Sequence, residues 1–166
     1  HRNKSGGYKT AILLTSLMFF QVLASSSLIV SASTTPPSGS GNWTINAGEV
    51  AHVSSQVLIQ GDVDVYGTLI IDDYGLYLWG ANDWDREIII HNGGRIELYN
   101  NSLISSYTST CFGFTVNDGG ELHVQDGIIQ RACSLQIYSR SEITLNQTVL
   151  EEGRIALTMP LNTCDT

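Results

Sequence analysis

Adjacent carboxylates are the first residues in this sequence that could do chemistry. Asp72 and Asp73 stand side by side, and inverting glycosidases use two carboxylates that flank the sugar bond. The chain has no Asn-Thr-Asp, His-Gly or Arg-Ile-Lys element to accompany them, and neither His91 nor His123 has flanking residues that support catalysis. We therefore interpret both aspartates as turn carboxylates, and we find no complete catalytic site in the sequence.

A cluster between residues 77 and 85 offers two further kinds of chemistry. Residues 82–85 (NDWD) could hold calcium through oxygen ligands, but they lack the glycine and glutamate spacing of a known calcium loop. Tyr77, Trp79 and Trp84 could stack on a sugar or pack over a corner of the fold, and we expect them to pack. No phosphate-binding loop, zinc cluster or nucleophile with its base is recognisable, so no metal or cofactor is expected.

The N-terminal segment predicts export. Arg2, Lys4 and Lys9 precede an apolar run at residues 11–22, and small residues follow it. This order is typical of a secretory signal peptide, which we place at residues 1–33. An uncleaved membrane anchor is the alternative, because the segment is long enough to cross a bilayer. Both readings predict a secreted or cell-surface location, with the membrane a partner only through this segment if it is uncleaved.

The rest of the chain divides into a linker and one acidic domain. Residues 34–41 are rich in Ser, Thr, Pro and Gly and are read as a linker, which leaves residues 42–166 for the folded domain. With 42% hydrophobic and 14% charged residues, the chain can bury a core. Beyond residue 40, only arginines balance the acidic residues, all 16 of which lie there. Such a surface repels phosphate backbones, so nucleic acid is not an expected partner.

An internal repeat decides the predicted fold. Segments that begin at Gly67, Gly94, Gly120 and Ser141 line up at spacings of about 20 to 27 residues. They predict three inward apolar columns: Leu69, Ile96, Leu122 and Ile143; Ile71, Leu98, Val124 and Leu145; and Leu76, Leu103, Ile129 and Leu150. Each copy follows a short strand with its own apolar pair: Val63/Val65, Ile88/Ile90, Phe114/Val116 and Leu135/Ile137.

Repeats of this length, with several short strands and no helical period, are typical of single coils of a solenoid. We therefore predict an all-β, right-handed parallel β-helix of about four to five coils, with its length differences gathered in loops at one corner. A β-sandwich is the alternative, although it would not require equal apolar columns. The segment from Trp43 to Val50 is expected to cap the first coil. The chain stops partway into another coil, so we expect a truncated domain, or one completed by more chain or another subunit.

The cysteines fit an oxidising compartment. Cys111 and Cys133 are separated by nearly one coil, so the predicted fold brings them almost above one another. We expect a disulfide between them, with two buried thiols as the alternative. Cys164 is left over, and the odd count fits a partner beyond Thr166.

Three sequons predict glycosylation at Asn42, Asn100 and Asn146. The last two fall on corresponding polar turns of their coils, where a glycan could be tolerated. Asn100, Asp126 and Gln147 occupy nearly the same turn, so in the unmodified chain we expect a ladder of side-chain hydrogen bonds there.

Several segments resemble the opening coils of archaeal cell-surface right-handed β-helix proteins. They are WTI from Trp43, VLIQGDVDVYGTLII from Val57 and IHNGGRIELYNNS from Ile90. That group is similar to the pectin-lyase-like superfamily, and the resemblance covers residues 42–154. It implies an exported envelope protein, and a carbohydrate-related role only at the level of the family.

Two functions follow as hypotheses. The first is an exported structural or adhesive module of the cell envelope, with cell-wall or extracellular polysaccharide, or another envelope protein, as its partner. The second is a carbohydrate-binding or polysaccharide-degrading protein of the pectin-lyase-like superfamily, whose catalytic coils lie outside this sequence. A calcium-stabilised binding module is a third possibility.

Overall fold

The computed structural model describes residues 34–37, 40–138 and 140–151, and the backbone of Ile155–Ala156. These residues belong to the compact unit Ser31–Thr166. The predicted signal peptide or anchor, part of the predicted linker, Arg154 and Cys164 lie outside the described residues. Within the part of the chain that is described, no helix is long and apolar enough to cross a membrane.

The strands form three parallel sheets, and every third strand along the chain belongs to the same sheet. The first sheet is six-stranded: β1 (Trp43–Ile45), β4 (Val63–Val65), β7 (Glu87–Ile90), β10 (Phe112–Val116), β13 (Ala132–Ile137) and β16 (Ile155–Ala156). The second is five-stranded: β2 (Val50–Val53), β5 (Thr68–Asp72), β8 (Arg95–Tyr99), β11 (Glu121–Gln125) and β14 (Glu142–Asn146). The third is also five-stranded: β3 (Val57–Ile59), β6 (Gly75–Leu78), β9 (Leu103–Ser106), β12 (Ile128–Gln130) and β15 (Val149–Glu151).

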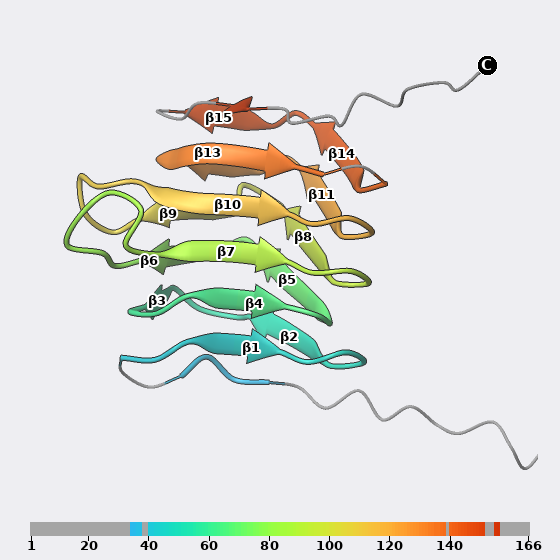
Figure 1. The fold of residues 1–166 in the computed structure, drawn as a ribbon, viewed down its shortest axis with the longest axis horizontal. Helices are drawn as coiled ribbons and strands as arrows, with labels where there is room; N and C mark the ends of the chain where they lie inside the picture. The colour runs from blue at the N-terminus through green and yellow to red at the C-terminus, as the bar shows by residue number, and fades with distance from the viewer. Residues whose placement is uncertain (1–33, 38–39, 139, 152–154, 157–166) are drawn as a thin grey trace, which may run out of the picture. The chain divides into compact units, whose positions relative to one another are not determined.

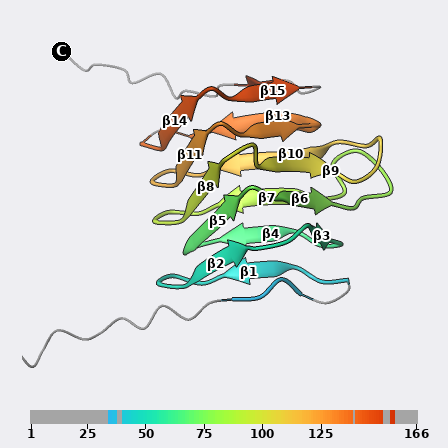
Figure 2. The same ribbon diagram turned by 180° about the vertical axis from the view of Figure 1, so that it is seen from behind.

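This topology is a right-handed parallel β-helix, as predicted. In Figure 1 the strands of the first sheet run to the right in front, and the chain climbs as it returns behind them. Figure 2 shows the second and third sheets from behind, stacked in the same order. Each of the five coils contributes one strand to each sheet, and every strand pairs in parallel with its neighbours above and below. The antiparallel layers of a β-sandwich are therefore excluded for the described residues.

Two of the three predicted apolar columns are confirmed. In the first column, Leu69 pairs with Ile96, and the ladder continues to Leu122 and Ile143. The second column also pairs in register, through Ile71, Leu98, Val124 and Leu145. The pairs predicted in the first sheet also stack in register, from Val63/Val65 to Leu135/Ile137. Their side chains fill a continuous core that is closed through the fourth coil, whereas Leu145 and Val149 in the fifth are each 43% exposed.

The third column is wrong by one residue. Leu76 pairs with Ile104 rather than Leu103, and Ile104 in turn pairs with Ile129. The reason is an extra residue in the third coil's turn, which runs from Asn100 to Ser102 where the second, fourth and fifth coils use two residues. Both Asn100 and Asn101 adopt positive φ, at 53° and 62°, and so absorb the insertion.

The predicted cap at residues 43–50 is also wrong. Trp43–Ile45 is a regular strand, β1, which pairs with β4, and the chain then continues into β2 of the same coil. Trp43 is buried over the first-sheet column, because its strand alternates inward and outward like those above it. The segment is therefore the first coil itself.

Glycines allow the coils to approach at the corner between the first and second sheets. A Cβ atom on Gly94 would lie 2.0 Å from the Val65 carbonyl oxygen, which is too close for any other residue. Gly93 and Gly119 adopt φ of +77° in the turns of successive coils. The repeated Gly-Gly pairs in the sequence thus mark a corner where one coil turns tightly against the next.

Candidate functional site

The corner between the third and first sheets is the irregular part of the molecule. We call it the long-loop corner: residues 79–86 after β6, residues 107–111 after β9, and residue 131 after β12. The two longer loops project side by side in Figures 1 and 2, and they account for most of the predicted difference in repeat length. Loops of this kind, held on a rigid scaffold, are where binding residues are usually placed.

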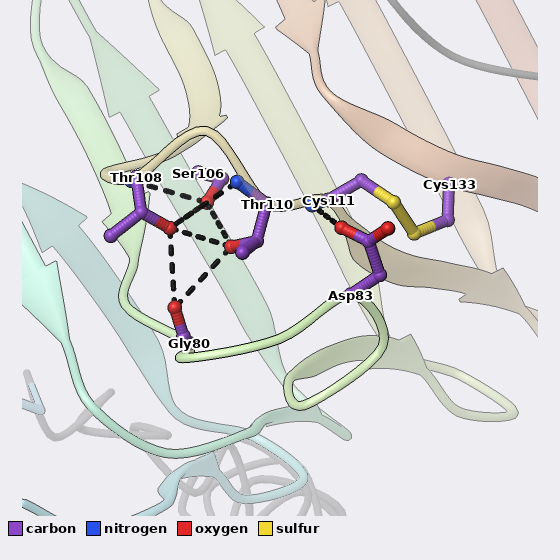
Figure 3. The surroundings of a disulfide bond; sticks show 7 residues. All are labelled: Gly80, Asp83, Ser106, Thr108, Thr110, Cys111 and Cys133. Atoms are coloured by element: carbon purple, nitrogen blue, oxygen red, sulfur yellow. Dashed lines mark hydrogen bonds between the residues drawn. A yellow bond between two sulfur atoms is a disulfide. The ribbon is translucent and has the colours of Figure 1, made fainter.

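Hydroxyl groups fasten the two loops to one another through a single carbonyl (Figure 3). Thr108 Oγ1 and Thr110 Oγ1 each donate to the Gly80 carbonyl oxygen, at 3.2 and 3.3 Å. Ser106 Oγ lies 3.3 Å from each of the two threonine hydroxyls. The bonds join two successive coils and satisfy a buried glycine carbonyl that no strand partner reaches.

A disulfide joins the same loops to the coil above. Cys111 and Cys133 are bonded, with Cα atoms 5.1 Å apart. A bulge makes this possible, because Phe112 pairs with Ala132 but Gly113 pairs with Ser134, which leaves Cys133 as the extra residue. Below, Asp83 Oδ1 accepts a hydrogen bond from the Cys111 backbone N–H at 2.9 Å (Figure 3).

Residues 82–85, which could offer calcium ligands but are not expected to bind a metal, are built into this bracing. Asp85 Oδ2 accepts from the Asn82 backbone N–H at 2.8 Å, so it closes the loop on itself. Asp83, Cys111 and Cys133 also lie close enough together to hold a metal ion. Because the two sulfurs are bonded to each other, they do not provide the thiolates that a metal would need.

Trp84 stands out within the long-loop corner. Its φ is +66°, which is a strained value for a bulky residue, and its side chain is 56% exposed. The loop fixes it in place, because the Trp84 N–H donates to the Cys111 carbonyl at 3.0 Å. The expectation that Tyr77, Trp79 and Trp84 pack over a corner of the fold holds for Tyr77, which is half-buried against Tyr107. It is wrong for Trp84 and for Trp79, which is also exposed, at 39%.

Charged side chains pair between coils on the outer faces of the first two sheets. On the first, His91 Nε2 lies 2.8 Å from Asp64 Oδ1, and the Tyr66 ring stacks on the imidazole with centroids 3.9 Å apart. On the second, Arg95 bridges Glu97 and Glu121. The hydrogen bond to Glu121 is the main cause that raises the pKa of Arg95.

Tyr99 belongs to the same face of the second sheet. Burial raises its pKa, and the hydrogen bond that its hydroxyl donates to Glu97 Oε2, at 3.1 Å, adds to this effect. His123 Nε2 lies 3.4 Å from Glu121 Oε2 but has no hydrogen-bond partner in the structure. These groups form a network of charged and hydrogen-bonded side chains on the outer face of the second sheet.

The paired aspartates lie at the corner between the second and third sheets. Asp73 adopts φ of +63° in the turn, and Asp72 Oδ1 accepts from Asn100 Nδ2 at 2.7 Å. This agrees with their interpretation as turn carboxylates. The stacked turns are linked mainly by backbone bonds, such as Asp126 N–H to the Asn146 carbonyl at 3.0 Å, and not by the predicted ladder of side chains.

The three sequon asparagines are all exposed, but their surroundings differ. Asn42 Oδ1 accepts from the Asp62 backbone N–H, and the Asn100 amide is bonded to Asp72. Ser102, the third residue of the Asn100 sequon, is fully buried with its hydroxyl 2.8 Å from the Ile71 carbonyl. Glycosylation at these positions stays a prediction.

Tyr107, Leu58 and the hydroxyl cluster around Gly80 were not predicted from the sequence. Tyr107 could have been found: once Ile104 replaces Leu103 in the third column, Tyr107 falls directly above Trp79. The hydroxyl cluster carried no such signal, because three hydroxyl residues in a loop are ordinary in composition. No protein-family model, curated protein or solved structure matches this chain.

Proposed function

We propose that this chain is an exported cell-envelope protein whose β-helix serves as a structural or adhesive module and not as an enzyme. The observation that carries the proposal is the unbroken stack of five coils, in which parallel ladders run the length of the described domain around a core that is closed through the fourth coil. Such a solenoid holds surface loops at fixed positions along a rod. The expected signal segment and the Cys111–Cys133 bond both suit an oxidising compartment outside the cell.

The chemistry of the surface supports the same proposal. Several carboxylates on the described domain have structural roles: Asp72 binds a neighbouring turn, Asp83 and Asp85 close the loops, and Glu121 pairs with Arg95. Cell-wall or extracellular polysaccharide, or another envelope protein, is the class of partner that we propose. The resemblance to archaeal surface β-helix proteins and the pectin-lyase-like superfamily is in keeping with this role but adds no site.

Carbohydrate binding is the second candidate, and the exposed aromatic side chains of the long-loop corner favour it. Polysaccharide degradation has weaker support, because Asp73 lies in a turn and Asp72 is hydrogen-bonded to Asn100. A screen for new reducing ends, with polygalacturonate and neutral polysaccharides as substrates, separates the two. We expect no cleavage by the full chain, and cleavage that Asp72→Asn abolishes would favour the enzyme.

Export can be tested with the full chain carrying a C-terminal epitope tag in a secreting host. We expect the tag outside the cell or on its surface, where added protease removes it. The matched control is Leu14→Arg, which places a charge in the apolar run and should retain the chain inside. Retention of the unaltered chain in the cytoplasm, with all three cysteines reactive to a thiol reagent, would overturn the proposal.

A further inference from the structure

The third sheet carries an exposed aromatic face where it meets the long-loop corner. We define this aromatic face as Leu58, Tyr77, Trp79 and Tyr107. Ile59, Leu78 and Ser106 point into the core, so the residues on either side of them point outward. Leu58 and Trp79 are each 39% exposed and Tyr107 is 58% exposed.

Register brings these rings together from two successive coils. The Trp79 N–H donates to the Ile59 carbonyl and the Tyr107 N–H to the Leu78 carbonyl, each at 2.8 Å, so Tyr107 occupies the position above Trp79. The rings of Tyr77 and Tyr107 meet edge to face, with centroids 6.3 Å apart and planes at 90°. The result is a stepped aromatic surface, about one strand spacing high per coil.

Contacts between neighbouring loops hold the backbone of the aromatic face in place. The residue after Trp79, Gly80, accepts the two threonine hydroxyls of the loop that follows Tyr107. The Cys111–Cys133 disulfide holds that loop at its other end (Figure 3). Rings held in this way lose little further freedom when a ligand binds, which favours affinity.

Charge around the aromatic face argues for an uncharged ligand. Arg86 donates through Nε to the Trp79 carbonyl and through Nη1 to the Asp85 carbonyl, at 3.1 and 2.7 Å. Arg131 donates through Nη1 to the Thr108 carbonyl. Arg86 and Arg131, the two cations nearest this surface, are engaged with the backbone, and their charge is balanced by Asp83 and Asp85. No excess of positive charge is left to attract an acidic sugar or an anionic membrane.

Polar groups continue the surface along the third sheet. In register with Tyr77 follow Ser105, which is buried, and then the more accessible Gln130 and Glu151. Ser105 Oγ donates to Gln130 Oε1 at 3.3 Å, and Gln130 Nε2 donates to Glu151 Oε2 at 3.2 Å. An apolar platform beside a strip of hydrogen-bonding groups matches a sugar ring, which has a C–H face and a rim of hydroxyls. It matches an alkyl chain or a purely apolar protein surface poorly.

We propose that the aromatic face binds a neutral saccharide, with Trp79 and Tyr107 as the stacking residues. The proposal deepens the adhesive role proposed above and rests on it, because it names the ligand class and the site through which the rod would attach. Binding involves no covalent step.

The test uses the full chain, secreted and oxidised, on a microarray that carries neutral and acidic oligosaccharides. We expect signal on neutral glycans and not on polygalacturonate fragments. Trp79→Ala and Tyr107→Ala should each weaken binding to the strongest neutral ligand by about tenfold or more, as the loss of a central aromatic contact usually does. The matched control is Tyr138→Ala, which removes an exposed tyrosine, at 42%, that follows the other end of a first-sheet strand.

Four outcomes would overturn the proposal: no neutral glycan bound, preference for acidic glycans, equal loss in Tyr138→Ala, or full binding by the Trp79→Ala/Tyr107→Ala variant. Sedimentation that shows a dimer dispersed by Trp79→Ala would instead assign the face to a second copy of the chain. The export assay separates the two proposals. A chain that is exported but binds no neutral glycan refutes only this inference, whereas a chain that binds but stays in the cytoplasm refutes the envelope role.

Discussion

Two corners of this β-helix turn the chain with different kinds of local structure. The corner between the second and third sheets repeats one conformation in successive coils, with positive φ at Asp73, Asn100, Asp126 and Gln147. The long-loop corner has no repeated conformation: its loops 79–86 and 107–111 differ in length and are held by a disulfide, a shared carbonyl acceptor and loop carboxylates. The regular corner therefore depends on stacking with its neighbours, and the irregular one on cross-links that the loops bring themselves.

This difference indicates that the residues that stabilise the domain and the residues available for binding lie at different corners. Side chains beneath the regular corner are buried in a ladder, so a change there disturbs the coils above and below. Side chains at the long-loop corner are exposed and individually braced, so they can vary without disturbing the stack. We expect the first corner to report mainly on folding and the second mainly on binding.

Leu98→Ala should have the largest effect on stability. Leu98 is fully buried beneath the regular corner, where a Cβ on Gly127 would meet it at 3.1 Å. Its truncation leaves a cavity and should lower the free energy of unfolding by about 2–5 kcal/mol, measured by urea denaturation. Leu145→Ala is the matched control from the same column; at 43% exposure it should cost far less. Equal losses would mean that the fifth coil is as tightly packed as the third.

Removal of the disulfide comes next. The Cys111→Ser/Cys133→Ser variant loses a cross-link with a sequence separation of 22 residues. We expect a loss of about 3 kcal/mol in the free energy of unfolding, because the unfolded chain is no longer constrained. Reduction by dithiothreitol should lower the unaltered chain to the level of the variant and leave the variant unchanged. If reduction has no effect on either, the two cysteines are not bonded in solution.

These two corners also mark how far the sequence could predict the structure. The columns through Leu69 and Ile71 were correct because buried aliphatic positions recur with the coil and tolerate no slip. The prediction of the third column failed at Leu103 because the turn before it contains one extra asparagine. Leu103 and Ile104 are both apolar, so the sequence pattern does not reveal this shift. The sequence predicts a cap at Trp43 where the structure has strand β1, because a large aromatic residue at the start of a domain is compatible with either.

The site was less predictable than the fold. The long-loop corner carries no repeat, so nothing in the spacing indicated that Thr108 and Thr110 meet Gly80. Exposure of Trp79 and Trp84 could not be inferred either, because aromatic residues in a loop are as often packed as displayed. The exposure of these two side chains depends on contacts between loops of neighbouring coils, and those contacts are set by the register of the whole stack.

A glycine at a left-handed position should stabilise the regular corner. Gln147 adopts φ of +49° and is exposed, so its side chain contributes strain without burial. Gln147→Gly should raise the free energy of unfolding by about 0.5–1 kcal/mol, the strain relieved less the added freedom of the unfolded chain. Thr144→Gly, in the extended strand β14, is the matched control and should lower it by a similar amount. If both substitutions destabilise, the turn is not under strain.

Tyr99 offers the finest comparison, because it ends β8 at the entrance to the regular corner. Burial, and then the hydrogen bond to Glu97, raise the pKa of its phenol in the folded chain. A raised pKa means that the folded state holds the proton more tightly, so this contribution to stability is complete below the unfolded value of about 10 and is lost as the pH rises above it. Relative to Tyr99→Phe, the unaltered chain should therefore lose stability only above about pH 10, measured as the difference between urea midpoints at neutral and alkaline pH. A difference that stays constant across that range would show that the phenol is as solvated in the folded chain as in the unfolded one, and that the regular corner is open to water where the ladder enters it.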